Sequence, residues 1–220
     1  MTGPKSLLSE LNASKSVVAA EGGPANAGRA KSYPGLTGAL LQLADLARDT
    51  AERLGPDIER AAAIVAATVK RRGTIFFCGN GGSAADAQHM ATEYVVRYMR
   101  DRKAYPAIAL TTDTSLLTAA GNDFGFDHIF SRQVEALCKP GDLLIIHSTS
   151  GNSPNVLKAA QAAKEGSVTV IAFSARDGGD LKDLVDLSIV VPTDRTDRAQ
   201  EIHLCIEHLI CDAIEQTLPN

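Results

Sequence analysis

Hydrophobic residues along this chain follow two different spacings, and the change falls near Gly73. From residue 36 to residue 73, apolar positions recur every three or four residues in two stretches that meet at Gly55 and Pro56. This spacing is typical of amphipathic helices, and the repeated pattern predicts a helical hairpin. Residues 1–35 have little periodicity and are rich in Gly, Ala, Ser, Pro and Lys. We therefore expect a weakly ordered tail over residues 1–35, followed by one domain over residues 36–220.

After residue 73, short apolar runs alternate with helical stretches. The runs cover residues 74–79, 106–112, 142–150, 168–174 and 187–193. Nearly continuous apolar runs of this length are typical of strands that are buried on both faces of a parallel sheet. The helical stretches cover residues 83–100, about 126–138, 153–165 and 179–185, and a long helix ends the chain. This alternation predicts an α/β fold with a doubly wound parallel sheet.

The composition argues against several classes of function. A net charge of −4 and a pI of 5.7 leave no basic surface of the kind that nucleic-acid binding requires. No apolar run approaches the ~18–20 residues of a membrane span, and no signal-peptide pattern is found, so we expect a cytoplasmic protein without membrane contact. Cys78, Cys138, Cys205 and Cys211 lack C-x-x-C spacing, and we expect buried free thiols.

A glycine-rich segment, CGNGGSAADA, follows the first predicted strand. Gly79, Gly81 and Gly82 allow close approach of the backbone, and Ser83 is expected as the N-cap of the next helix. The free N–H groups of a helix N-terminus favour an anion. The dinucleotide pattern G-x-G-x-x-G is not met, because Ala84 stands at its third glycine, and no Walker lysine is present. The alternative is a plain tight turn.

A second polar segment, HSTSGNSPN, follows the third predicted strand. Its four hydroxyls belong to Ser148, Thr149, Ser150 and Ser153. Hydroxyls and free N–H groups before a helix suit a phosphate monoester, although an ordinary serine-rich cap is the simpler alternative. After the second strand, Asn122 and Asp123 stand in a glycine-flanked segment that we expect to be a loop able to bond sugar hydroxyls, or only a turn.

Two predicted helices carry groups that suit metal binding or proton transfer. His89 and Glu93 are four residues apart and share a helix face, so they could ligate a divalent metal, act as an acid/base pair, or be a plain surface pair. The last helix adds further polar residues, namely Gln200, Glu201, His203, Glu207 and His208. Their spacing alone leaves open which of them takes part.

Several motifs together resemble the phosphoheptose isomerases, the sedoheptulose 7-phosphate isomerase group of SIS-domain proteins. They are GNGGSAADAQH, TEYVVRY, PAIALTTD, GNDFGFDHIFSRQVEAL, GDLLIIHSTSGNSPNVLKAA and QEIHLCIEHLI, in the family's order and spacing. The similarity runs from about Leu40 to Leu218. It implies a five-stranded, flavodoxin-like SIS fold, a homotetramer with active sites at subunit interfaces, and one zinc ion per subunit.

The resemblance also implies roles for individual residues. Glu93 matches the catalytic base and His208 the catalytic acid, while His203 is left a helix-surface or interface role. The metal positions are His89, Glu93, Gln200 and His208. The substrate positions are Asn80, Gly81, Gly82, Ser83, Glu93, Asn122, Asp123, Ser148, Thr149, Ser150, Ser153 and Gln200. The implied reaction converts sedoheptulose 7-phosphate to D-glycero-D-manno-heptose 7-phosphate through an enediol, the entry step to ADP-heptose.

A non-enzymatic role is the main rival. A related tetrameric SIS protein regulates replication by binding an initiator protein, and other SIS proteins sense sugar phosphates. The replication regulator lacks the Glu and His at the positions that match Glu93 and His208. Because this chain has both, together with His89 and Gln200, the sequence favours the isomerase.

Overall fold

The structure is a computed structural model that describes residue 35 and residues 37–218. The chain divides into two compact units, residues 1–45 and 46–220. The described part of the first unit consists of residue 35 and residues 37–45, which include the start of helix α2 (Gly38–Lys70). Apart from Gly35, the N-terminal tail expected from the sequence lies outside the described residues.

The expected helical hairpin is not formed, because α2 is one helix of 33 residues with Pro56 inside it. The two periodic stretches, residues 36–54 and 55–73, follow one another directly, whereas a helix–helix connection normally takes about two to eight loop residues. Pro56 removes one backbone hydrogen bond, yet the residues on both sides keep helical geometry. In the second unit, α2 buries the apolar side chains of Ala61, Val65 and Val69, together with Thr50 and Thr68.

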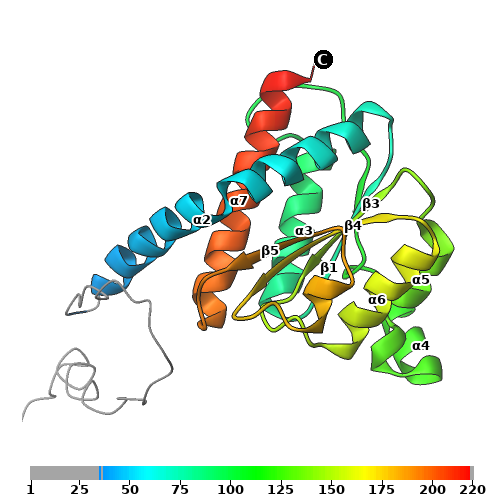
Figure 1. Ribbon diagram of the computed structural model, residues 1–220. Coiled ribbons are helices and arrows are strands. Elements are labelled where there is room, and N and C mark those ends of the chain that lie inside the picture. Colours follow the sequence, from blue (N-terminus) through cyan, green and yellow to red (C-terminus); the bar gives the residue numbers. More distant parts are fainter. Residues whose placement is uncertain (1–34, 36, 219–220) are drawn as a thin grey trace, which may run out of the picture. The chain divides into compact units, whose positions relative to one another are not determined.

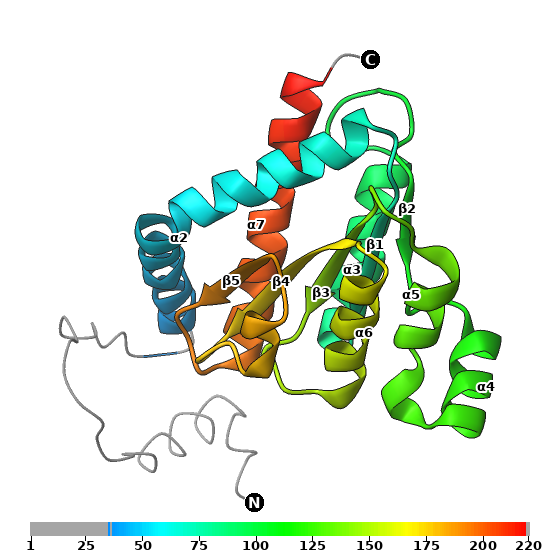
Figure 2. The ribbon, with the colours of Figure 1, turned by 45° about the vertical axis from the view of Figure 1, so that its right-hand side comes forward.

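The five predicted strands are confirmed. They are β1 (Ile75–Gly79), β2 (Ala107–Ala109), β3 (Leu143–His147), β4 (Thr169–Ala175) and β5 (Leu187–Val191). All pair in parallel, in the order β2-β1-β3-β4-β5 (Figures 1 and 2). Every residue of β1 and β3 is buried. The order reverses between β1 and β3, so the carboxyl ends of these two strands border the crevice where such sheets bind ligands.

Helices cover both faces of this sheet. Helices α3 (Gly82–Val95) and α7 (Thr196–Thr217) lie side by side on one face, and α6 (Pro154–Glu165) packs with α5 (Ser131–Leu137) on the other (Figures 1 and 2). Short 3-10 turns, η2 (Phe126–His128) and η3 (Asp180–Asp183), complete the connections. Successive side chains along each strand point to opposite faces of the sheet, so they pack against two different pairs of helices.

One helix was not expected from the sequence. Helix α4 (Thr114–Phe124) contains Asn122 and Asp123, which the sequence had placed in a loop. Asp113 starts the helix by accepting a hydrogen bond from the N–H of Leu116. The glycine at position 121 was misread as a loop residue because glycine more often breaks a helix than continues it. The prediction of a loop at these two residues is therefore wrong.

The cysteine prediction holds for two of the four thiols. Cys78 and Cys211 are buried, Cys138 is partly buried and Cys205 is exposed, and all four are free. Cys205 was expected in the interior because it stands among apolar residues, but it lies on the outer side of α7. None of the helices in the described ranges is long and apolar enough to cross a membrane.

Candidate functional site

The glycine loop joins β1 to α3 and leaves the start of that helix open. Gly81, with a φ of 57°, is the N-cap, so the prediction that Ser83 caps the helix is wrong. Ser83 lies buried in the first turn instead. At Gly82, a Cβ atom would stand 2.6 Å from Nε2 of Gln200, so glycine is required for the approach of that side chain. The loop brings backbone N–H groups to the carboxyl edge of the sheet.

The hydroxyl loop, Ser148–Ser153, joins β3 to α6. The hydroxyls of Ser148 and Ser150 accept hydrogen bonds from the N–H groups of Gly151 and Asn152, which holds the loop in shape. Ser153 is the N-cap of α6, but its side chain makes no capping hydrogen bond. Among the residues that the structure describes, the hydroxyls of Thr149 and Ser153 have no partner. An ordinary serine cap would have used the Ser153 hydroxyl, so both groups are available to a ligand.

The two loops line one pocket of about 280 Å³. Asn80 of the glycine loop and Asn155 in the first turn of α6, directly after the hydroxyl loop, exchange two side-chain hydrogen bonds of 2.9 and 2.8 Å. The lining residues are Asn80, Gly81, Gly82, Ser83, His147, Ser148, Thr149, Ser150, Ser153, Thr196 and Gln200. Apart from His147, these lining residues carry no ionisable group. The pocket therefore offers neutral hydrogen-bond donors, which suit a phosphate group that keeps its own charge.

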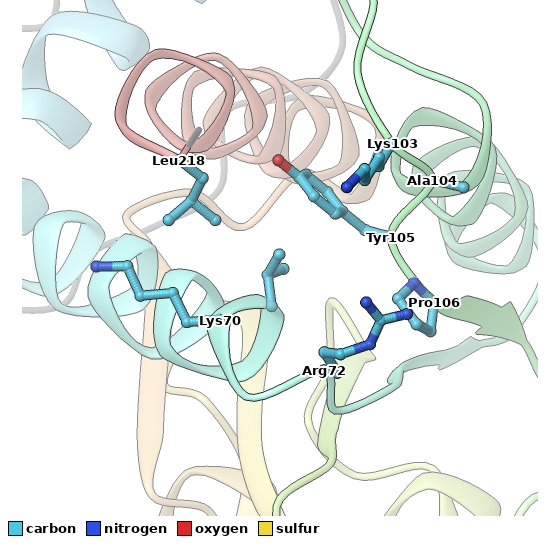
Figure 3. Close-up of a pocket in the computed structure, with 8 residues that line it drawn as sticks. Lys70, Arg72, Lys103, Ala104, Tyr105, Pro106 and Leu218 are labelled. Atoms are coloured by element: carbon cyan, nitrogen blue, oxygen red, sulfur yellow. The ribbon is translucent and has the colours of Figure 1, made fainter. Parts of the chain in front are cut away.

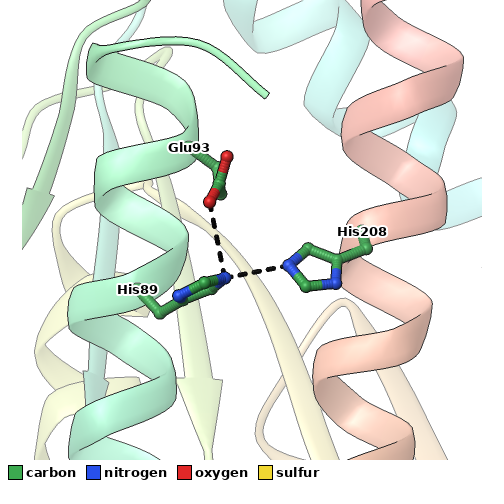
Figure 4. A group of neighbouring side chains, drawn as sticks. All are labelled: His89, Glu93 and His208. Atoms are coloured by element: carbon green, nitrogen blue, oxygen red, sulfur yellow. Dashed lines mark hydrogen bonds and ion pairs between the residues drawn. The ribbon is translucent and has the colours of Figure 1, made fainter. Parts of the chain in front are cut away.

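Three ionisable side chains meet between α3 and α7 (Figure 4). Nε2 of His89 lies 2.9 Å from Nε2 of His208 and 3.4 Å from Oε1 of Glu93. One ligand atom from each of the three residues falls within 4.8 Å of the others, a spacing that allows a single metal ion to contact all three. Two imidazole nitrogens and a carboxylate oxygen form a donor set that zinc accepts, with a further position left for another ligand.

Gln200 connects this group to the pocket. Its amide lies against Gly82, and its Nε2 is 3.4 Å from the hydroxyl of Ser83. Gln200 and His208 are eight residues apart on α7, about 12 Å along the helix axis, and both face α3. Helix α7 therefore runs from the pocket to the His89–Glu93–His208 group. The assignment of Gln200 as a fourth metal ligand remains a prediction.

Asn122 and Asp123 are not brought into this pocket by the single chain. Both are exposed on α4, where the amide of Asn122 donates to Oδ1 of Asp123 over 2.8 Å. Their assignment to sugar binding remains a prediction.

The buried face of α7 carries two residues whose surroundings the sequence did not predict. His203 is fully buried, and its Nε2 donates to the carbonyl of Ser174 over 2.9 Å. Burial lowers the pKa of His203 to about 3, so the ring is neutral at neutral pH. The expected surface role of His203 is therefore wrong. A helical count could have found it, because His203 shares a face with Ala199, Ile206 and Ile210.

Glu207 on the same face contacts His147 at the end of β3. His147 Nε2 lies 2.9 Å from Oε2 of Glu207, and both residues are buried. Burial alone would lower the pKa of His147, but the carboxylate of Glu207 more than offsets this, and the pKa is raised. The histidine thus has a carboxylate partner directly beneath the pocket.

A second pocket, of about 330 Å³, lies near the amino ends of β1 and β2 (Figure 3). Lys70, Arg72 and Lys103 stand around it with Tyr105 and Pro106. All three cations are exposed, and no carboxylate or imidazole belongs to its lining. Parallel α/β sheets bind their ligands at the opposite, carboxyl ends of the strands. We therefore take the pocket between the glycine and hydroxyl loops as the candidate site.

The fold and this site define a class of protein. Residues 40–175 match the SIS domain family, so the chain is an SIS-domain protein.

Comparison with individual proteins narrows the class. The chain is 51% identical over 175 residues to a phosphoheptose isomerase from Rhodospirillum rubrum, covering 78% of this chain and 93% of that protein. It is 54% identical over 162 residues to one from Helicobacter hepaticus, covering 74% and 83%. The solved phosphoheptose isomerase from Neisseria gonorrhoeae has a TM-score of 0.78 at 43% identity, covering 83% of this chain and 97% of that one. The chain belongs to the phosphoheptose isomerase family.

Proposed function

We propose that this protein converts sedoheptulose 7-phosphate into D-glycero-D-manno-heptose 7-phosphate. One observation carries the proposal: a pocket rich in hydroxyl and amide hydrogen-bond donors and a His–Glu–His group lie along the same pair of helices. The first suits a phosphate group, and the second suits proton transfer next to a carbonyl. Membership of the phosphoheptose isomerase family supports the choice of substrate.

The distance between the two parts fits this substrate. Ser83 and His89 are six residues apart on α3, about 9 Å along the helix axis. An extended chain gains about 1.2 Å per bond, so the eight bonds from C1 of the heptulose to phosphorus span about 10 Å. With its phosphate between the glycine and hydroxyl loops, the substrate can therefore place C1 and C2 beside Glu93 and His208.

At the phosphate end, the hydroxyls of Thr149 and Ser153 and the N–H groups at the starts of α3 and α6 hold the anion. These contacts lie far from the reacting carbons, so their binding energy serves to position the chain.

At the other end, Glu93 acts as the base. Its carboxylate takes a proton from C1 while His208 gives a proton to the oxygen on C2, which yields an enediol. Glu93 then returns its proton to C2, and the oxygen on C1 loses a proton to His208, which leaves an aldehyde at C1. Atoms and charge balance, because both protons taken up are given back.

We propose that His89, Glu93 and His208 hold one zinc ion per subunit, with Gln200 as the fourth ligand. Because Gln200 lies about 12 Å from His208 along α7, it would reach the metal only by turning its side chain away from Gly82 toward an ion between the two residues, or as a ligand in the site of another subunit. When bound, zinc would polarise the carbonyl and stabilise negative charge on its oxygen. Glu93 has two oxygens and His208 two ring nitrogens, so each residue can contact the metal through one atom and keep the other for the substrate. The fit of two imidazoles and one carboxylate supports this assignment.

We also propose a cytoplasmic homotetramer whose sites are completed by neighbouring subunits. Large apolar side chains are exposed just after α3 and next to His208 on α7, with Val96, Met99 and Leu209 exposed by 63%, 68% and 58%. Phe124 and Phe126, next to Asn122 and Asp123, are exposed by 56% and 63%. Exposed apolar surface of this kind favours contact with another chain. Through it, the Asn122–Asp123 segment of one subunit can reach the pocket of another.

The test is turnover of sedoheptulose 7-phosphate by zinc-loaded protein, followed as formation of aldoheptose phosphate. We expect Glu93→Gln and His208→Ala to abolish turnover while the assembly stays intact, and a chelator to remove activity that zinc restores. Glu201→Gln is the matched control, since Glu201 lies on the exposed side of α7 with Arg198 as its partner. Absence of turnover in the zinc-loaded wild-type protein would contradict the proposal and favour an initiator-binding or sugar-sensing role.

A further inference from the structure

The proposed reaction leaves unused a buried ion pair that joins the two halves of the site. His147 Nε2 and Glu207 Oε2 lie 2.9 Å apart, and their side chains are exposed by only 0% and 3%. His147 is the last residue of β3, and Glu207 lies in the middle of α7. The two residues are 60 positions apart in the sequence.

Each partner directly precedes a residue of the site. Ser148, the first residue of the hydroxyl loop, follows His147, and His208 follows Glu207. The imidazole of His147 also lines the pocket itself. It stacks between Phe77 and Phe173, at centroid distances of 6.3 and 5.7 Å, so it has little freedom to turn. A rigid polar contact therefore links the end of β3 to the helix that carries His208.

Stability alone does not explain a pair of this kind. A well-packed apolar pair of similar volume is often as stable as a buried ion pair, because taking charges out of water is costly. A buried charged hydrogen bond fixes the orientation and the distance of its two partners, because their attraction is strong where water is absent. The position of this pair is therefore more informative than its contribution to folding.

We propose that His147 and Glu207 are positioning residues that fix the hydroxyl loop relative to the part of α7 that carries His208. This inference rests on the proposed function, in which the loop holds the phosphate and His208 serves the reacting carbons. Without the pair, each half still binds its own part of the substrate, but C1 and C2 are less well aligned with Glu93. The rate of the chemical step then falls more than substrate binding does.

The main variant is the double substitution His147→Leu with Glu207→Leu, which removes both charges at similar volume. We expect kcat to fall about tenfold or more, while KM and the binding of inorganic phosphate stay within about threefold. His147→Gln, which keeps an N–H donor near the position of Nε2, should retain kcat within about threefold. Full kcat in the double variant would overturn the inference, as would a parallel loss of phosphate binding.

A control separates positioning from loss of stability. Ile189→Ala removes a fully buried side chain from β5, in the same sheet but outside the pocket lining. We expect it to destabilise the fold without lowering kcat. If Ile189→Ala lowers kcat as much as the double variant does, the pair has only a structural role.

A second measurement does not depend on activity. Inorganic phosphate should slow amide hydrogen exchange in residues 205–208, which lie outside the pocket lining, in the wild-type protein, and should not slow it in the double variant. Equal slowing in both proteins, or none in the wild-type protein, would overturn the inference. If the wild-type protein turns over no phosphoheptose, the proposed function fails. The exchange experiment still decides whether the His147–Glu207 pair couples the hydroxyl loop to α7.

Discussion

Glu215 holds together the segment that follows α3, and its substitution should cost both stability and activity. Its carboxylate accepts hydrogen bonds from the N–H groups of Tyr98, Met99 and Arg100, over 2.8 to 2.9 Å. It also pairs with Arg102 at 2.9 Å, and the side chains of Arg102 and Glu215 are exposed by only 3% and 1%. Burial alone would raise the pKa of Glu215, but these backbone hydrogen bonds and Arg102 lower it, so the carboxylate stays charged.

The same contacts reach the His89–Glu93–His208 group. Arg102 donates to the carbonyls of Glu93 and Tyr94, which fixes the last turn of α3. Tyr98, whose N–H bonds to Glu215, stacks on His208 with the two ring centroids 5.2 Å apart. The carboxylate therefore helps to hold Glu93 and His208 in place without touching either.

Glu215→Gln keeps the size of the side chain but replaces one oxygen by an NH₂ group that faces N–H donors. It removes the charge that balances Arg102 and at least one accepting position. Hydrogen bonds to charged groups contribute about 1.5–3 kcal/mol each, and breaking a buried ion pair costs about 3–5 kcal/mol. Because these effects overlap, we expect the free energy of unfolding to fall by about 3–5 kcal/mol. We also expect kcat to fall about tenfold where the variant is still folded.

Denaturant unfolding followed by circular dichroism measures the change in stability. Glu201→Gln is the control, because the Glu201 side chain is 43% exposed and its contact with Arg198 is open to water, so it should contribute less than about 1 kcal/mol. A Glu215→Gln protein as stable as the Glu201→Gln protein would refute the reasoning. It would mean that the buried carboxylate is no better than an amide for these donors.

The sheet could be predicted from the sequence because its strands are buried on both faces. The five strands run in nearly continuous apolar stretches, and such stretches have few alternatives in a chain with alternating helices. The helical N-terminal region was harder, since the periodicity of α2 is the same on both sides of Pro56 and does not report whether the chain turns there. Helix α4 was missed because its glycine was taken as a loop residue.

The sequence could predict those parts of the candidate site that follow the ends of strands. It could not predict the parts that depend on contacts between distant elements. The glycine and hydroxyl loops follow two strands, and the sheet topology places them together. Spacing alone could not choose among the polar residues of the last helix. The structure separates them, because Glu207 faces the sheet while His208 faces α3. The partner of His147 could not be found from local pattern, since no local signal links a strand end to a helix so far along the chain.

Two further predictions concern Gly82 and His203. A Cβ at Gly82 would stand 2.6 Å from the amide of Gln200, which is the end of a flexible side chain. Gly82→Ala should therefore leave the fold intact but displace Gln200, and kinetic assays should show turnover reduced about tenfold or more. Folding lowers the pKa of His203 from 6.5 to about 3. As the pH falls, the ring is therefore protonated in the unfolded chain at a higher pH than in the folded protein. The free energy of unfolding therefore falls as the pH drops below the pKa of the histidine in the unfolded chain, by up to about 1.4 kcal/mol per pH unit. His203→Gln keeps a donor for the carbonyl of Ser174 but cannot titrate. From about pH 6 to pH 4, its free energy of unfolding should fall by about 2 kcal/mol less than that of the wild-type protein. His147, with a raised pKa and the opposite sign, is present in both proteins, so the difference belongs to His203. Equal acid sensitivity of the two proteins would show that the buried ring of His203 does not resist protonation.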